Sequence, residues 1–257
     1  MSAARGAQGR ERRKGDNPHV RAPPVVILCG GCGTRLREHA QTIPKPLVEI
    51  GGRPILWHVI RIYASQGFER FVLCLGHKGE LIKDFVRSDG LPDGLAIECV
   101  DTGEETPTGG RIAQVADRLG GERFCVTYAD GVADVDLAEL LAFHSGHRAL
   151  ATMTVVQPEL QFGVAELNGD GHVRGFTEKP RFDGWINGGF FCFEPGGLDY
   201  IGADSVLERE PLERLAAAGE LRAFRHRGFW DCMDTYKDAV LLNDLWREDR
   251  APWKLWA

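Results

Sequence analysis

A glycine-rich segment, residues 30–36, is the first place where residue types and spacing point to chemistry. It reads Gly-Gly-Cys-Gly-Thr-Arg-Leu, it follows a short apolar run, and Lys45 stands nine residues beyond it between two prolines. Glycines let the backbone approach a ligand closely, so that N–H groups converge on phosphate oxygens, and Arg35 and Lys45 add positive charge. The pattern predicts a cradle for a nucleoside triphosphate made of Gly30, Gly31, Gly33, Thr34, Arg35 and Lys45.

Other interpretations of this loop can be weighed by inspection. Position 36 is Leu rather than the third glycine of a dinucleotide-binding fingerprint, and the loop lacks the Gly-Lys-Ser/Thr ending of a P-loop. Cys29 and Cys32 have the spacing of a redox pair or of half a zinc site, but no second ligand pair stands at zinc spacing elsewhere in the sequence. A glycine-rich turn that binds nothing is the structural alternative.

Asp130 is the second candidate, because it comes directly after the apolar run 124–128. That run predicts a buried strand, and ligands of open α/β sheets bind at the carboxyl ends of the strands. Asp130-Gly131 can also be a simple turn, and Asp234, which precedes Thr235, can contribute to a helix N-cap.

The elements that must position these residues follow from hydrophobic patterning. From residue 23 onward, short β-branched and apolar runs alternate with amphipathic segments, which indicates βαβ units around a parallel sheet. Pro54 opens a helix that Gly67 ends. The second half is richer in strands, with a turn at 168–171, so a mixed sheet is expected. The predicted strands are 25–28, 71–75, 95–100, 124–128, 151–156, 163–167 and 173–178.

Two later segments carry helix-start signals. Ser205 to Glu208 fits a capping box, which predicts a helix beginning there. Thr235 can cap a last helix whose apolar residues are Val240, Leu241 and Leu245.

The composition indicates one globular unit. A chain of 257 residues that is 43% hydrophobic can bury one large core, so residues 23–257 are expected to form a single domain behind a flexible tail, residues 1–22. No run approaches the roughly 18 apolar residues that cross a membrane, and the N-terminus lacks a signal-peptide core, so we expect a cytoplasmic protein. The net charge of -6 argues against nucleic-acid binding. The seven cysteines are expected to be reduced, packed thiols.

With these features in place, the sequence resembles the sugar-phosphate nucleotidyltransferases. From about residue 25 to the C-terminus it is similar to their glucose-1-phosphate cytidylyltransferase branch. Besides the glycine-rich loop with Lys45, the matching stretches are 44–52 (PKPLVEIGG), 101–103 (DTG), 108–111 (TGGR), 128–134 (YADGVAD), 178–180 (EKP), 186–191 (INGGFF) and 233–235 (MDT).

The resemblance implies an activity and a fold. The activity is the magnesium-dependent transfer of a nucleoside monophosphate from CTP to glucose 1-phosphate, with release of pyrophosphate. The fold is a Rossmann-like, mixed and mainly parallel sheet flanked by helices, with a smaller β-rich part that binds the sugar. The partners are then a nucleotide, a sugar 1-phosphate and, in a homo-oligomer, further copies of the chain.

The resemblance also implies roles for single residues. The catalytic residues would be Arg35, Lys45, Asp130 and Lys179. Lys45 would act at the α-phosphate, and Lys179 would bind the phosphate of the sugar 1-phosphate. Asp130 and Asp234 would hold Mg²⁺. The residues along the sugar would be Gly163, Glu178 and Asn187. Those near the base would be Thr108, Gly110 and Arg111.

The sequence departs from the branch between Phe85 and Asp101, where an insertion that contributes to the nucleotide site and to subunit contacts is missing. This keeps UTP or dTTP, with another hexose 1-phosphate, as alternatives, and it leaves the oligomeric state open. Lys179 can also be a surface lysine, and Arg111 can be a first-turn residue of the helix that follows. A non-catalytic nucleotide-sugar-binding regulator is the alternative from another functional class.

Overall fold

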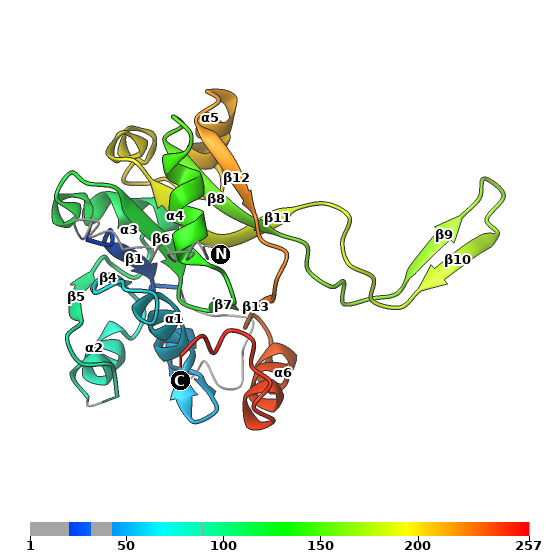
Figure 1. Ribbon diagram of the computed structural model, residues 1–257, viewed down its shortest axis with the longest axis horizontal. Helices are drawn as coiled ribbons and strands as arrows, with labels where there is room; N and C mark the ends of the chain where they lie inside the picture. The colour runs from blue at the N-terminus through cyan, green and yellow to red at the C-terminus, as the bar shows by residue number, and fades with distance from the viewer. Residues whose placement is uncertain (1–20, 32–42, 89, 257) are drawn as a thin grey trace, which may run out of the picture.

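The computed structural model describes residues 21–31, 43–88 and 90–256, and its centre is a seven-stranded sheet (Figure 1). Six of these strands are parallel to one another, and only β11 runs antiparallel to its two neighbours. The predicted mixed, mainly parallel sheet is therefore confirmed. In spatial order the strands are β12 (Leu221–Arg225), β8 (Ala151–Val156), β11 (Ile186–Phe193), β6 (Phe124–Tyr128), β1 (Val25–Leu28), β4 (Arg70–Leu75) and β5 (Ala96–Asp101).

Helices cover both faces of the sheet. Val25 and Ile27 of β1 pack with α1 and α4, whereas Val26 and Leu28 pack with α3 and α5. A strand that is buried on both faces must be apolar at every position, as β1 is. The helices are α1 (Ile55–Ala64), α2 (Gly79–Arg87), α3 (Thr108–Gln114), α4 (Leu137–Ser145), α5 (Glu210–Ala217) and α6 (Tyr236–Arg247), with 3₁₀ turns η1 (Lys45–Leu47), η2 (Ala116–Leu119) and η3 (Pro195–Tyr200).

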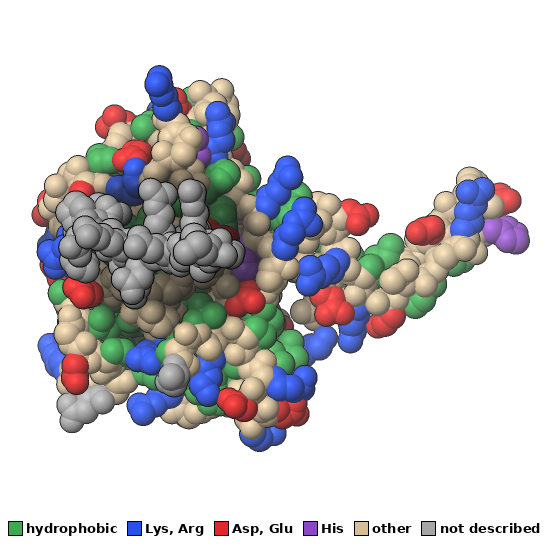
Figure 2. Space-filling model, viewed as in Figure 1, with side chains coloured by type: hydrophobic (Ala, Val, Ile, Leu, Met, Phe, Trp, Pro, Cys, Tyr) green, Lys and Arg blue, Asp and Glu red, His purple; other side chains and the backbone are tan. Residues whose placement is uncertain are grey.

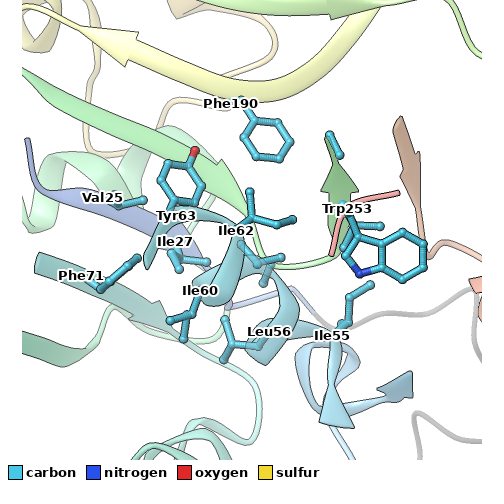
Figure 3. Close-up of a cluster of buried hydrophobic side chains, with 14 of the residues drawn as sticks. Val25, Ile27, Ile55, Leu56, Ile60, Ile62, Tyr63, Phe71, Phe190 and Trp253 are labelled. Atoms are coloured by element: carbon cyan, nitrogen blue, oxygen red, sulfur yellow. The ribbon is translucent and has the colours of Figure 1, made fainter. Parts of the chain in front are cut away.

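Helix α1 is the centre of the larger core cluster. The ring of its Tyr63 stacks on Phe190 with 5.8 Å between centroids, and Trp253 near the C-terminus is fully buried against the same cluster (Figure 3). His58 is also fully buried: Nε2 lies 2.8 Å from the carbonyl oxygen of Ile50, and Nδ1 accepts from Trp253 Nε1 at 3.2 Å. Burial lowers the pKa of His58 to about 4, so the ring is neutral near pH 7.

A two-stranded arm projects from this body (Figures 1 and 2). Strands β9 (Val164–Leu167) and β10 (Val173–Thr177) pair antiparallel with each other. Large apolar side chains on the arm are exposed, among them Phe162 at 80% and Phe176 at 65%. An isolated two-stranded hairpin is only marginally stable in water. Two further small sheets pair β2 (Glu49–Ile50) with β3 (Arg53–Pro54) and β7 (Gly131–Ala133) with β13 (Trp230–Cys232).

One expectation about helix starts is confirmed and one is wrong. Thr235 forms a capping box with Asp238 at the start of α6. Ser205 does not begin a helix: its hydroxyl donates to the carbonyl oxygen of Gly202 at 2.8 Å, and α5 begins only at Glu210, where Pro211 occupies the first turn. A proline is pre-organised for that position, and here it decides the start of the helix.

The remaining whole-chain predictions concern thiols, membrane segments and the tail. The six cysteines of the described residues are free thiols, and Cys125 and Cys192 on neighbouring strands have their sulfurs 3.7 Å apart. Across the described parts of the chain, none of the helices has the length and apolar character needed to cross a bilayer. Residues 1–20 of the predicted tail, and Cys32, lie outside the described residues.

Candidate active site

A cavity of about 340 Å³ opens at the carboxyl ends of β1 and β6, the edge where the sequence places the glycine-rich loop and Asp130. Its walls come from the end of β1, from η1, from the segment leading into α3 and from the β6–β7 turn. Of the predicted site residues, Gly30, Gly31, Lys45, Thr108, Arg111 and Asp130 line it, together with Glu104, Thr106 and Tyr128. The predicted residues Gly33, Thr34 and Arg35 lie outside the described residues.

Two carboxylates converge on Lys45, which lines the cavity together with Asp130. Lys45 Nζ donates to Asp130 Oδ2 at 2.5 Å and to Asp234 Oδ1 at 2.6 Å. The side chains are 13%, 26% and 41% exposed, so the cluster is half-buried and open on the side of Asp234. The structure thus brings together three charged residues that the sequence proposes separately.

A short antiparallel ribbon explains why the two carboxylates are neighbours. Strand β7 begins directly after Asp130, β13 ends two residues before Asp234, and the two strands pair with Gly131 opposite Cys232. The backbone N–H of Met233 donates to the carbonyl oxygen of Asp130 at 2.9 Å, which extends the ladder by one step. Antiparallel pairing places the start of one strand beside the end of the other, so both aspartates lie at the same end of the ribbon.

Helix α6 fixes the segment that carries Asp234. Thr235 is the N-cap, and its backbone N–H donates to Asp238 Oδ2 at 2.7 Å. The Asp234 backbone N–H donates to the same oxygen at 3.1 Å. The capping role is therefore taken by Thr235 and Asp238, and the Asp234 carboxylate is directed at Lys45 instead.

The carboxylate pair has the geometry to share a divalent cation. Two oxygens that lie 2.5 and 2.6 Å from one nitrogen are at most about 5 Å apart, and Mg²⁺ holds its ligands at about 2.0–2.1 Å, so a small approach suffices. Within the described residues, no three His, Cys, Asp or Glu side chains form a metal cluster. A cation here would need further oxygens from phosphates or water, which is the ligand set typical of Mg²⁺.

The protonation state of Lys45 results from opposing effects. Burial alone would lower its pKa, because burial disfavours the charged ammonium. The charge and hydrogen bonds of Asp130 and Asp234 outweigh burial, and the pKa of Lys45 is raised above its ordinary value. Lys45 is therefore a fixed cation at the edge of the cavity.

Arg111 lies beneath the cavity and is only 4% exposed. Its Nη1 donates to the carbonyl oxygen of Leu75 at 2.8 Å and to Thr102 Oγ1 at 2.7 Å, and Nη2 donates to the carbonyl oxygens of Gly30 and Glu104 at 3.1 and 3.0 Å. The guanidinium thus joins the ends of β1, β4 and β5. A contact between Arg111 and the base stays a prediction.

Two glycines of the site are required by neighbouring protein atoms. A Cβ on Gly30 would lie 2.0 Å from Cζ of Arg111, and one on Gly110 would lie 2.0 Å from the carbonyl oxygen of Ala203. The N–H of Gly110 also donates to the carbonyl oxygen of Ser205 at 3.1 Å. Gly110 therefore allows the start of α3 to pack on the 202–208 segment, whatever its role toward a nucleotide.

Two residues that the sequence analysis did not assign to the site, Tyr128 and Glu208, join the predicted nucleotide and sugar residues. Tyr128 Oη donates to Glu208 Oε1 at 2.6 Å and accepts from Asn187 Nδ2 at 3.1 Å, while Thr108 Oγ1 donates to Glu208 Oε2 at 2.7 Å. Tyr128 stands two residues before Asp130, at the carboxyl end of β6, which is the one sequence signal for it. The local signal at Glu208 was the capping box with Ser205, which points to a helix start and not to the site, and the structure places Glu208 in a turn segment before α5.

The other predicted sugar residues lie on the arm rather than beside Lys45. Glu178 and Lys179 follow the end of β10, and a Cβ on Gly163 would lie 2.7 Å from Glu178 Oε2, so these three residues are neighbours. Lys179 has a positive φ of 46° and is exposed. The arm extends away from the body that carries the cavity (Figure 1). Of the four predicted sugar residues, only Asn187 on β11 contacts a residue that lines the cavity, Tyr128.

Comparisons with known proteins identify the family of the chain. Residues 24–230 match the nucleotidyl transferase family, so the chain belongs to that family. The sequence is 43% identical over 255 residues to the glucose-1-phosphate cytidylyltransferase of Salmonella typhimurium, and 42% identical over 253 residues to a probable glucose-1-phosphate cytidylyltransferase of Bacillus subtilis. Each alignment covers 90% of this chain and 99% of the relative. Within the family, the chain belongs to the glucose-1-phosphate cytidylyltransferase branch, and the predicted resemblance is confirmed.

The fold has close structural counterparts as well. The crystal structure of a UDP-glucose pyrophosphorylase complexed with UDP-glucose superposes with a TM-score of 0.70 at 15% identity, covering 89% of this chain and 99% of that one. At this level of identity the likeness concerns the fold alone. It confirms the predicted nucleotidyltransferase fold.

Proposed function

We propose that the chain transfers CMP from CTP to glucose 1-phosphate, giving CDP-glucose and pyrophosphate. The observation that carries this proposal is the convergence of Asp130 and Asp234 on Lys45, a residue that lines the cavity. The chain that carries this cluster aligns with two cytidylyltransferases over nearly their whole length. Two negatively charged substrates must meet here. The positive charge that organises them would come from Lys45 and from a divalent cation held by the two carboxylates.

The reaction needs in-line attack of a sugar-phosphate oxygen on the α-phosphorus, with the bond to pyrophosphate breaking. Lys45 would leave one of its carboxylates to contact the α-phosphate and stabilise the charge that develops there. The glycine backbone at Gly30 and Gly31, with Gly33, Thr34 and Arg35 as further candidates, would hold the triphosphate.

Asp130 and Asp234 are the residues that would hold Mg²⁺ in this reaction. A bound Mg²⁺ supplies charge neutralisation and aligns the phosphate oxygens for displacement. The protein contributes the position of the two carboxylates, which the β7–β13 ribbon sets.

For the sugar 1-phosphate we propose a role for the arm of a second copy of the chain. Lys179 and Glu178 keep their proposed roles toward phosphate and sugar, but they lie on an arm that stands clear of its own body (Figures 1 and 2). The arm exposes Phe162, Phe176, Leu167 and Val173, the last two at 64% and 61%. Burial of these side chains against another copy would stabilise the hairpin and bring Lys179 to a neighbouring cavity.

The activity is tested by a pyrophosphate-release assay with several nucleoside triphosphates and a panel of sugar 1-phosphates, followed by identification of the product by mass spectrometry. The proposal expects the highest kcat/KM for CTP with glucose 1-phosphate. A higher kcat/KM for UTP or dTTP would contradict the nucleotide, and the absence of turnover with every pair would contradict catalysis itself.

The shared site is tested by mixing two defective variants. We expect Lys45→Ala to lower kcat and Lys179→Ala to raise the KM for glucose 1-phosphate, so both are slow at low sugar concentration. If one copy supplies Lys45 and another Lys179, co-expression in equal amounts should restore about a quarter of the wild-type activity through mixed oligomers. Activity no higher than that of the separate variants, or a monomer by light scattering, would contradict the shared site.

A further inference from the structure

Two hydrogen bonds fix the direction of the Thr108 hydroxyl. A threonine hydroxyl can donate one hydrogen bond and accept two, and it normally rotates to suit its surroundings. Here it accepts from the backbone N–H of Leu207 at 2.9 Å and donates to Glu208 Oε2 at 2.7 Å. Its proton is therefore committed to the carboxylate, and one lone pair remains on a side chain that lines the nucleotide cavity.

Glu208 sets this direction because a carboxylate can only accept. Its other oxygen, Oε1, accepts from the Tyr128 hydroxyl at 2.6 Å, so both oxygens are occupied by hydroxyl protons. A carboxylate oxygen has no proton to give, so the phenol of Tyr128 is the donor in this hydrogen bond. The Tyr128 hydroxyl in turn accepts from the Asn187 amide. Every hydrogen bond of the group thus points toward Glu208.

We propose that Glu208 determines the choice of base by holding the Thr108 hydroxyl as an acceptor toward the cavity, where it meets the 4-amino group of cytosine. Cytosine carries an amino donor at the position where uracil and thymine carry a carbonyl acceptor. A site that presents only a lone pair there leaves the carbonyl of uracil without a donor. This inference rests on the proposed use of CTP and adds the residue that would enforce it.

The substitution Glu208→Gln tests the inference because it keeps the shape and replaces one acceptor by a donor. The amide NH₂ group cannot accept from a hydroxyl, so the hydroxyl that faces it must turn its proton away. If that hydroxyl is Thr108, the proton points into the cavity and favours uracil. We expect the ratio of kcat/KM for CTP to kcat/KM for UTP to fall at least about tenfold, chiefly through a loss with CTP.

Thr108→Val provides a second route, because it removes the hydroxyl and keeps the branched shape. It should lower the same ratio, and adding Glu208→Gln to it should have little further effect, because the two residues act through one hydrogen bond. Ser205→Ala is the matched control. It removes a hydroxyl from the same segment, where Ser205 Oγ donates to the carbonyl oxygen of Gly202, and it should leave the ratio unchanged.

The outcomes separate this inference from the proposed function. A wild-type enzyme that does not prefer CTP overturns both. A wild-type preference for CTP that survives in Thr108→Val overturns the inference and leaves the function standing. An equal loss with CTP and UTP also overturns it, because Thr108 would then contact a part of the nucleotide that both share. Melting temperatures of all variants exclude a general loss of folding as the cause.

Discussion

Removing the Lys45 ammonium should leave the two carboxylates facing each other and open to a divalent cation. We therefore predict that Lys45→Met lowers the stability of the protein without ligands and makes its stability depend on Mg²⁺. In the wild type the ammonium lies 2.5 and 2.6 Å from Asp130 and Asp234 and screens their repulsion, and Mg²⁺ must compete with it. Methionine keeps the length of the side chain and removes the charge.

The magnitude follows from the geometry. At a separation of about 5 Å, two unit charges repel each other by about 3 kcal/mol at an effective dielectric constant of 20 and by about 1 kcal/mol in bulk water. The carboxylates are 26% and 41% exposed, so the value lies between these limits and is reduced by solvent. We expect the free energy of unfolding to fall by about 1–3 kcal/mol, and Mg²⁺ to restore it as the logarithm of its concentration.

Urea unfolding followed by tryptophan fluorescence, with and without Mg²⁺, measures both effects in the absence of nucleotide. Lys83→Met is the matched control. Lys83 also pairs with a carboxylate, that of Glu80 on α2, but among the described residues Glu80 is its only ion-pair partner. It should show no Mg²⁺-dependent stability. A Lys45→Met protein as stable as the wild type and indifferent to Mg²⁺ would show that the carboxylates do not form a shared cation site.

Three further outcomes are expected. Asp130→Asn and Asp234→Asn should each lower kcat at least about 100-fold with the fold intact by circular dichroism, and near-normal Mg²⁺-dependent turnover in either would refute the metal assignment. His58 has a folded pKa of about 4, below its ordinary value of 6.5, so the free energy of unfolding should be highest above about pH 6.5 and should fall by about 2–3 kcal/mol as the pH falls toward 4. Urea titrations should therefore show a shallower pH dependence for His58→Phe than for the wild type or for His172→Phe, the control at an exposed site. Equal slopes would contradict this. Deletion of residues 1–20 should leave activity and melting temperature nearly unchanged, and a drop of many degrees would mean that the tail packs on the domain.

The sheet could be predicted because its central strands are short apolar runs that can only be buried. The runs at 25–28, 124–128 and 151–156 coincide with β1, β6 and β8 to the residue. Each strand is largely buried on both faces of the sheet, so nearly every side chain must be apolar or hydrogen-bonded, and such a continuous run marks the strand clearly in the sequence. The turn at 168–171 was likewise predictable, because its residues favour a tight turn between two strands.

Helix boundaries and faces were less predictable because tertiary contacts decide them. Helix α6 begins at its predicted cap, yet Val240 and Leu241 are 40% and 49% exposed, and the helix buries Ala239 and Leu242 instead. The apolar residues of this helix cover more than one face, so composition alone cannot tell which side meets the core. Ser205 shows the same limit, since a nearby proline overrides its local capping signal.

For the active site, the residue types could be predicted from the sequence, but the contacts between them could not. Lys45, Asp130 and Asp234 could each be named from motif and position, but they are separated by up to 189 residues, and only the β7–β13 ribbon shows that one nitrogen meets both carboxylates. Arg111 was predicted to face the base, whereas its hydrogen bonds to the protein are visible only once β1, β4 and β5 lie side by side. Glu208 is held by two partners from other elements, Thr108 and Tyr128, so no pattern around it could reveal its place in the site. Motifs therefore identify the groups that meet phosphate, while the residues that orient those groups emerge from long-range packing.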